Sequence, residues 1–237
     1  MPQATFLVLI LSLFVLSPTP NNSQDAQRSV WLQAGCEVRS ESKDQNGSNR
    51  LVLSCPGATF DDKQTPCAPL MTVPDALRVL SKRTPLLECH GPASGWTPIT
   101  GVLRAGCLFG HWISYVAYDH QKFRMLKSWP DFREFFGPVT TADEALAYAA
   151  ALTGASPRYT VEAPPKYKPL IKNIQPTRVT ADKTGFVVRL FEQHACVINP
   201  TWQAVDMHVA TDGTVKELSR KDVFTPKSGH PNACCMD

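Results

Sequence analysis

The stretch TADEALAYAAALTG at residues 141–154 contains the clearest helix signal in this chain of 237 residues. Thr141 is followed three residues later by Glu144, a capping-box pattern in which the hydroxyl and the carboxylate satisfy N–H groups at the start of a helix. Gly154 stands where a left-handed residue commonly ends a helix. We predict a helix from Asp143 to Leu152 with one buried stripe, formed by Ala145, Leu146, Ala149 and Leu152.

The sequence after this helix has the pattern of an antiparallel β-meander. Residues 178–181 and 186–192 flank a turn at 182–185, and residues 202–211 and 214–220 flank Asp212-Gly213. We expect Val205, Met207, Val209 and Leu218 on one face, and Asp206, His208 and Glu217 on the other, with His208 opposite Glu217. A helix followed by a curved antiparallel sheet is similar, in the order of its elements alone, to cystatin-like and PepSY-like modules.

The sequence before the helix begins with a predicted hairpin. Residues 30–39 and 50–55 have strand character and flank the turn sequence at 44–47. If those four residues form the loop, the facing pairs are Lys43 with Ser48, Val38 with Leu53, and Cys36 with Cys55. The apolar pattern and the cysteine pair select the same register, and this agreement predicts a Cys36–Cys55 disulfide.

The middle of the chain predicts further mixed structure. We expect a short helix at residues 73–80, a Pro- and Gly-rich stretch at 85–101, and a strand at 108–118 that turns at 119–122 into a strand ending near Trp129. The proline-rich residues 163–176 predict an extended surface segment. The fold class is therefore α+β, with a disulfide-stapled region at 27–135 and a helix-plus-meander region at 136–237, either separate or continuous.

An apolar run at Phe6–Leu16 predicts export. The run is too short to cross a bilayer, which needs about 20 residues, and it is typical of the hydrophobic part of a signal peptide. We assign residues 1–26 to a leader that is either cleaved or kept as an anchor. The mature chain is then expected to have no membrane span and to be secreted or periplasmic.

The eight cysteines are interpreted in that light, because a thiol in an oxidising compartment is a disulfide partner first. Their even number favours four disulfides. Cys234 and Cys235 are adjacent and are expected to reach different partners. Beyond Cys36–Cys55 the pairing is open for Cys67, Cys89, Cys107, Cys196, Cys234 and Cys235.

The stretch GHWISYVAYD at residues 110–119 resembles the histidine-bearing strand of papain-like thiol hydrolases, especially the Gly-His-Tyr-x-x-Tyr pattern of ubiquitin-specific proteases. The resemblance implies that His111 would activate a cysteine thiolate, with Cys89 or Cys107 as the nucleophile. The alternative is that these aromatic residues build the core and a sheet face.

Composition limits the classes of partner. Lys and Arg number 24 against 21 Asp and Glu, and both signs are dispersed, which argues against a nucleic-acid-binding face. The sequence has no zinc-ligand spacing and no nucleotide motif, so we expect neither a metal nor a cofactor.

Lys166, Lys168 and Lys172 on the proline-rich segment are candidates to dock an acidic partner, and the alternative is a solvated loop. We expect a non-enzymatic exported protein that binds an unknown protein or small molecule. The alternatives are a cysteine-dependent hydrolase that uses His111 and a structural envelope component.

Overall fold

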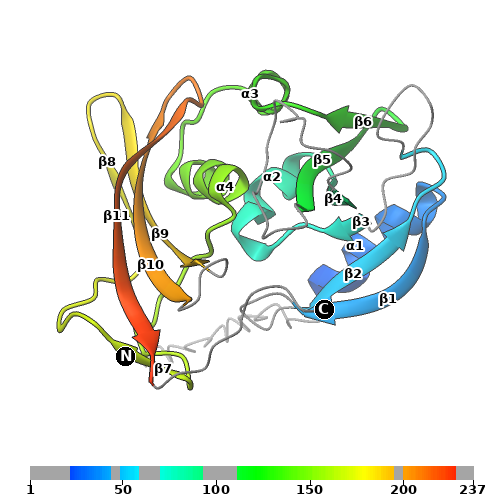
Figure 1. Ribbon diagram of the computed structural model, residues 1–237. Coiled ribbons are helices and arrows are strands. Elements are labelled where there is room, and N and C mark those ends of the chain that lie inside the picture. Colours follow the sequence, from blue (N-terminus) through cyan, green and yellow to red (C-terminus); the bar gives the residue numbers. More distant parts are fainter. Residues whose placement is uncertain (1–21, 44–48, 59–69, 93–110, 195–199, 228–237) are drawn as a thin grey trace, which may run out of the picture.

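The computed structural model describes residues 22–43, 49–58, 70–92, 111–194 and 200–227, which form two antiparallel sheets with helices between and around them (Figure 1). The first sheet has the order β1 (Glu37–Lys43), β2 (Asn49–Ser54), β3 (Leu70–Thr72), β4 (Leu86–Pro92), β5 (His111–Asp119) and β6 (Lys122–Leu126). The second has the order β7 (Tyr167–Pro169), β11 (Val215–Pro226), β10 (Thr201–Ala210), β9 (Gly185–His194) and β8 (Arg178–Ala181). The helices are α1 (Asn22–Gln33), α2 (Arg78–Arg83) after a 3-10 turn η1 (Asp75–Leu77), α3 (Trp129–Phe136) and α4 (Ala142–Thr153). The predicted α+β class is confirmed.

Helix α4 lies between the two sheets (Figure 1). One core cluster joins its alanines to Leu86 and Tyr115 of the first sheet and to Val188 and Val205 of the second. The predicted single stripe is too narrow. Leu146 and Leu152 are only partly buried, whereas four apolar residues outside the stripe are buried as well, namely Ala147, Tyr148, Ala150 and Ala151. A helix with a sheet on each side must be apolar nearly all round, and alanine lets both sheets approach it.

The ends of α4 are those that the sequence predicts. Thr141 Oγ1 accepts a hydrogen bond from the Glu144 N–H, and Glu144 Oε2 accepts one from the Thr141 N–H. Gly154 follows the helix with φ of 72°, in the left-handed region. The capping-box and glycine predictions are confirmed.

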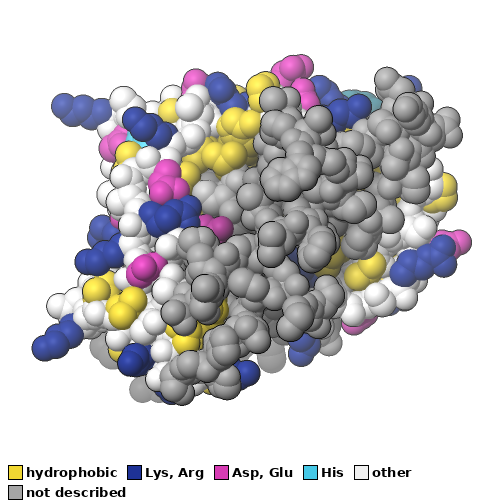
Figure 2. All heavy atoms as spheres, viewed as in Figure 1, with side chains coloured by type: hydrophobic (Ala, Val, Ile, Leu, Met, Phe, Trp, Pro, Cys, Tyr) yellow, Lys and Arg dark blue, Asp and Glu magenta, His cyan; other side chains and the backbone are white. Residues whose placement is uncertain are grey.

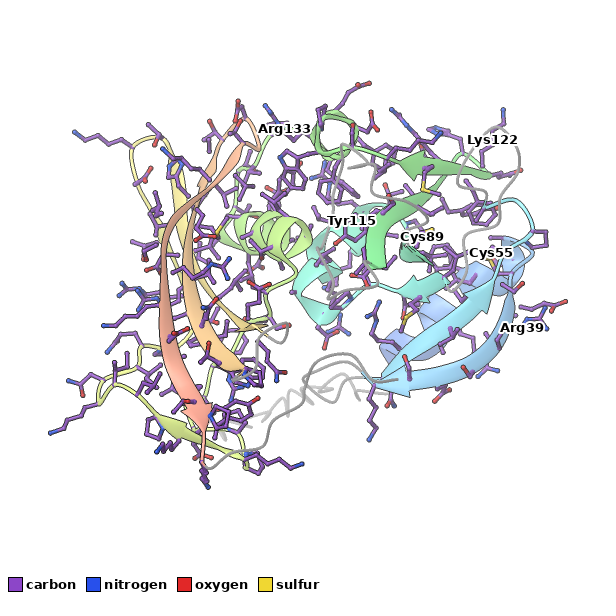
Figure 3. The ribbon with its side chains drawn as sticks, viewed as in Figure 1. Arg39, Cys55, Cys89, Tyr115, Lys122 and Arg133 are labelled. Atoms are coloured by element: carbon purple, nitrogen blue, oxygen red, sulfur yellow. A yellow bond between two sulfur atoms is a disulfide. The ribbon has the colours of Figure 1, made fainter. Side chains whose placement is uncertain are left out.

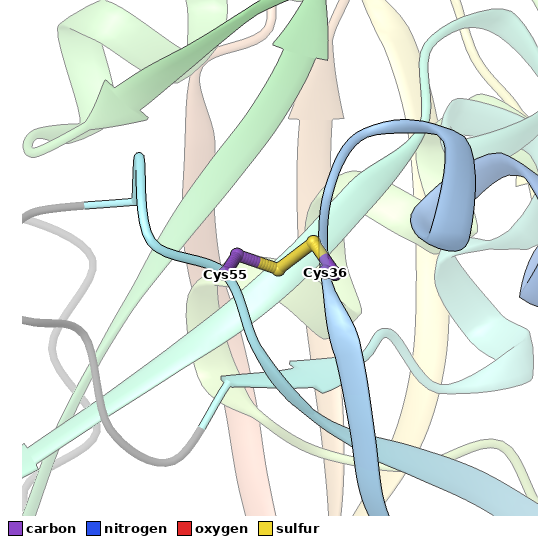
Figure 4. The surroundings of a disulfide bond; sticks show 2 residues. All are labelled: Cys36 and Cys55. Carbon is purple, nitrogen blue, oxygen red and sulfur yellow. A yellow bond between two sulfur atoms is a disulfide. The ribbon is translucent and has the colours of Figure 1, made fainter.

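The hairpin of β1 and β2 confirms the Cys36–Cys55 disulfide (Figure 4) and the facing pair Val38 with Leu53. Lys43 faces Asn49 rather than the predicted Ser48, because Arg39 forms a bulge that adds one residue to β1. The start of the predicted first strand is also wrong.

Residues 30–33 belong to α1, which begins inside the predicted leader. Trp31 is buried and lies 6.3 Å from the Tyr118 ring, so a helix covers this face of the first sheet. Leu32 is exposed rather than part of an apolar strand face.

The middle segment contains more regular structure than predicted. Strand β4 occupies the first part of the Pro- and Gly-rich stretch, and the predicted 73–80 helix is the η1–α2 pair at 75–83. His120 and Gln121 both have positive φ, as the predicted turn between β5 and β6 requires. Trp129 begins α3 instead of ending a strand, because Ser128 and Asp131 form a second capping box.

The predicted strands of the second sheet are confirmed, and β11 extends further, to Pro226. The turn between β10 and β11 takes three residues, 211–213, so Met207 faces Glu217 and His208 faces Lys216 instead of Glu217. A register shift between Asp206 and Met207 then restores the predicted pairing from Asp206 onward. The shift leaves Leu218 53% exposed, so its predicted place on the buried face is wrong. The buried places of Val205, Met207 and Val209 are confirmed.

Candidate functional site

Residues 155–177, which we call the strap, cross the second sheet on the face opposite α4. Phe191 and Ala204 lie on that face, because their neighbours Leu190 and Val205 belong to the α4 core and successive strand residues point to opposite sides. The strap packs its apolar residues against Phe191, Val223 and Phe224; these strap residues are Val161, Ala163, Tyr167, Ile171 and Ile174. The proline-rich segment is thus bound to the sheet along its length.

Backbone hydrogen bonds hold the strap in place. Ser156 N–H donates to the Phe191 carbonyl oxygen over 2.8 Å, and Leu170 N–H donates to the Val223 carbonyl oxygen over 2.8 Å. Within the strap, β7 pairs with the end of β11. The position of each outward side chain is therefore set by the sheet beneath it.

Arg158 fixes one end of the strap through its side chain. Its guanidinium lies 4.8 Å from the centre of the Trp202 ring and 5.7 Å from that of Phe224, and it donates a hydrogen bond to the Glu162 carbonyl oxygen. Burial lowers the pKa of Arg158, but an arginine remains protonated at any physiological pH. The Arg158 guanidinium therefore makes its contacts within the protein, with Trp202, Phe224 and the Glu162 carbonyl oxygen.

The three predicted lysines have a different environment. Lys166, Lys168 and Lys172 are exposed, and none of them forms an ion pair with any part of the chain that the structure describes. Figure 2 shows dark-blue Lys and Arg side chains projecting at the lower left, where Figure 1 places β7. The structure thus leaves the strap lysines available for contact with a partner.

Two large apolar side chains are exposed on the same segment. Tyr159 is 68% exposed and Leu170 is 49% exposed. Leu170 stands in the sequence Lys168-Pro169-Leu170-Ile171-Lys172, with a lysine two residues away on each side. The sequence predicts the lysines as candidate contacts but not Leu170, although a leucine between two lysines on a proline-rich segment is a pattern that could have indicated its exposure.

The face of the second sheet opposite α4, which we call the outer face, is also basic where the strap does not cover it. Arg178, Arg189, Asp206 and Ser219 form a row across four strands. Arg189 donates two hydrogen bonds of 2.7 Å to the Asp206 carboxylate and thereby lowers the pKa of Asp206. Because Asp206 is neutralised by Arg189, Arg178 is left as excess positive charge beside the strap.

A second polar cluster on this face is not a catalytic triad. His208 Nε2 lies 3.0 Å from Thr184 Oγ1 and 3.2 Å from Asp182 Oδ2. In a triad the carboxylate holds the other ring nitrogen from the one that faces the hydroxyl, whereas here both contacts are to Nε2. Asp182 instead closes the turn, where hydrogen bonds led by the Thr184 N–H lower its pKa.

The structure does not bring His111 and Cys89 to facing positions. In the β4–β5 ladder His111 is opposite Pro92 and Cys89 is opposite Ser114, so three residues, about 10 Å of strand, separate the two positions. Cys89 is itself disulfide-bonded, and in this form it has no thiolate. Cys67, Cys107, Cys196, Cys234 and Cys235 lie outside the described residues.

Within the described ranges, His, Cys, Asp and Glu form no group of three or more that would hold a metal ion. Among the helices of those ranges, none has both the length and the apolar character needed to cross a bilayer. No protein-family model matches this chain, and no curated protein or solved structure matches it significantly.

Proposed function

We propose that this chain is an exported, disulfide-stabilised protein that uses the strap and the adjoining outer face of the second sheet to bind a partner carrying negative charge. The observation that carries the proposal is that three exposed lysines stand close together on one segment whose backbone the sheet holds in place. Arg189, Arg133 and Arg83 are each paired with a carboxylate, whereas the three strap lysines are exposed and unpaired among the described residues.

The exposed apolar side chains support the same proposal. Binding surfaces combine polar rims with apolar or aromatic contacts that water leaves on association. The strap provides Leu170 and Tyr159 beside its lysines, on a backbone already fixed by the sheet. A fixed backbone lowers the entropy lost on binding.

Secretion or periplasmic export is part of the proposal. The apolar run Phe6–Leu16 and the Cys36–Cys55 disulfide both support an oxidising destination. Mass spectrometry of the protein recovered outside the cytoplasm gives the mass of the mature chain, and this mass identifies its N-terminal residue. A chain that stays in the cytoplasm with reduced cysteines would contradict this part of the proposal.

The binding test uses poly-L-glutamate immobilised on a column, because it carries carboxylates and no apolar surface. We expect the K166Q/K168Q/K172Q variant to elute at clearly lower salt than the wild type. The matched control is K82Q/K122Q/K127Q, which removes three exposed lysines elsewhere; Figure 3 labels Lys122 on the opposite side of the molecule from β7. Equal elution of both variants would overturn the strap as the binding surface.

A further inference from the structure

We infer that the anionic partner is a membrane surface containing anionic lipids, with Leu170 entering the interface while the lysines beside it contact the headgroups. The inference rests on the proposed function and adds the class of partner. It is carried by the arrangement of cationic and apolar side chains on the strap.

The sequence around Leu170 has the composition of an interfacial contact. Lys168 and Lys172 flank it at two residues on either side, and Pro169 and Leu170 are both exposed. A lysine places its apolar stem along apolar material while its ammonium group stays at the polar boundary. Two such side chains around one leucine match the boundary between headgroups and acyl chains.

The outward position of Leu170 is imposed by the fold. Its N–H is bonded to the Val223 carbonyl oxygen, and the next residue, Ile171, packs into the apolar cluster under the strap. Tyr167 is fixed in turn by a hydrogen bond of 2.8 Å from Gln193 Nε2 to its hydroxyl. Leu170 therefore cannot turn inward without detaching the strap, and it gains a less polar environment only from a partner.

Two features favour a membrane over an acidic protein. Strand β7 is an edge strand, but it has only three residues and contains Pro169, which lacks an N–H, so an added strand from a protein partner would find little to pair with. The second feature is that positive charge extends beyond the strap over the neighbouring surface. Exposed Arg178, Lys221 and Lys227 lie on the same sheet face or beside β7 in addition to the strap lysines. A broad positive surface matches many headgroups better than one acidic peptide.

The expected loss of membrane affinity can be estimated for each type of side chain. Each lysine near an anionic membrane strengthens binding about fivefold, so the loss of three weakens it about a hundredfold. The loss of one partly inserted leucine weakens binding about tenfold. Added salt weakens the electrostatic part.

The test is co-sedimentation of the exported, disulfide-bonded protein with vesicles of phosphatidylcholine, alone or mixed in equal amounts with phosphatidylserine. We expect binding to the mixed vesicles only. K166Q/K168Q/K172Q should lower the partition coefficient about a hundredfold and L170Q about tenfold. The matched controls, K82Q/K122Q/K127Q and L32Q, should bind as the wild type does, since Leu32 is exposed to a similar extent, 52%, on α1.

The outcomes separate this inference from the proposed function. Binding to poly-L-glutamate without binding to the mixed vesicles would overturn the membrane and leave the proposed function standing. Absence of both would overturn both. Equal vesicle binding by L170Q and the wild type would overturn the insertion of Leu170. Far-ultraviolet circular dichroism of each variant checks that it is folded, and a misfolded L170Q is replaced by L170S.

Discussion

Arg50 on β2 reaches across β3 to Glu88 on β4, and its Nη2 donates to Glu88 Oε2 over 2.8 Å at a buried site. On the way its Nε donates to the Thr72 carbonyl oxygen, while the Leu51 N–H donates to Thr72 Oγ1. One arginine therefore joins three neighbouring strands. Strand β3 has only three residues, and this contact adds to the few ladder hydrogen bonds that fix its register.

Removing one partner of this ion pair should destabilise the protein strongly. Arg50→Met leaves the Glu88 carboxylate without its arginine in a buried site, and we expect the free energy of unfolding in urea to fall by about 3–5 kcal/mol. The double variant R50M/E88L should recover most of that loss. Arg39→Met is the control, because Arg39 and Glu37 form an exposed pair and should contribute little. A double variant as unstable as R50M would contradict the explanation.

The alanines of α4 should tolerate no enlargement. Ala149 is fully buried, and Ala149→Leu is expected to lower the free energy of unfolding by about 1–3 kcal/mol, because the sheets on either side leave no room for the added carbons. Ala142→Leu, at the exposed start of the same helix, is the matched control and should change stability little. Equal effects of the two substitutions in thermal or urea unfolding would show that the helix is not enclosed.

The Cys36–Cys55 disulfide should contribute stability through the unfolded chain. The two cysteines are 19 residues apart, and closing such a loop corresponds to about 3 kcal/mol in the chain-entropy model. C36A/C55A should lose about that amount in urea unfolding. Mass spectrometry of the unreduced, denatured wild type should find Cys36 joined to Cys55, and Cys89 should remain unlabelled by a thiol reagent. Labelling of Cys89 would reopen the hydrolase alternative.

Stability should fall in acid partly through Asp206. Hydrogen bonds from Arg189 lower the pKa of Asp206 in the folded protein, so the folded state binds fewer protons than the unfolded state. The resulting stabilisation is complete above the unfolded pKa of about 4 and is lost as the pH falls through the folded pKa. Urea unfolding from pH about 7 to about 2 should therefore show a smaller decline in D206N than in the wild type.

The control for this pH dependence is Glu41→Gln, on exposed β1, where the carboxylate forms no ion pair within the described residues. This variant should follow the wild-type decline. If D206N and the wild type decline in parallel, the hydrogen bonds from Arg189 do not account for the acid sensitivity.

Local signals predicted much of the fold correctly. The capping box at Thr141, the turn at Asp212-Gly213 and the facing cysteines 36 and 55 each act over a few residues or across one hairpin. Such features are set by hydrogen bonding and by the period of the chain, which are visible in a sequence. The strap lysines were visible for the same reason, because proline excludes them from a helix or a central strand.

The errors arose where a distant part of the chain decided the outcome. A bulge at Arg39 changed the register of β1 with β2, and residues 30–33 became helix because Trp31 packs on the first sheet. Neither event has a strong local signal, since a bulge or a docked helix is stabilised by contacts with residues far along the chain. The Arg50–Glu88 pair, whose members are 38 residues apart, was invisible for the same reason.

The sequence by itself determined the class of this protein: mixed helix and antiparallel strands, the Cys36–Cys55 disulfide and an exposed basic segment. Local hydrogen-bonding and hydrophobic patterns specify those elements independently of how the elements pack against one another. Only the tertiary structure decided that α4 is enclosed by two sheets and that the strap is fastened with Leu170 facing outward. Those features depend on which apolar surfaces meet, and burial is settled by packing between segments distant in the chain.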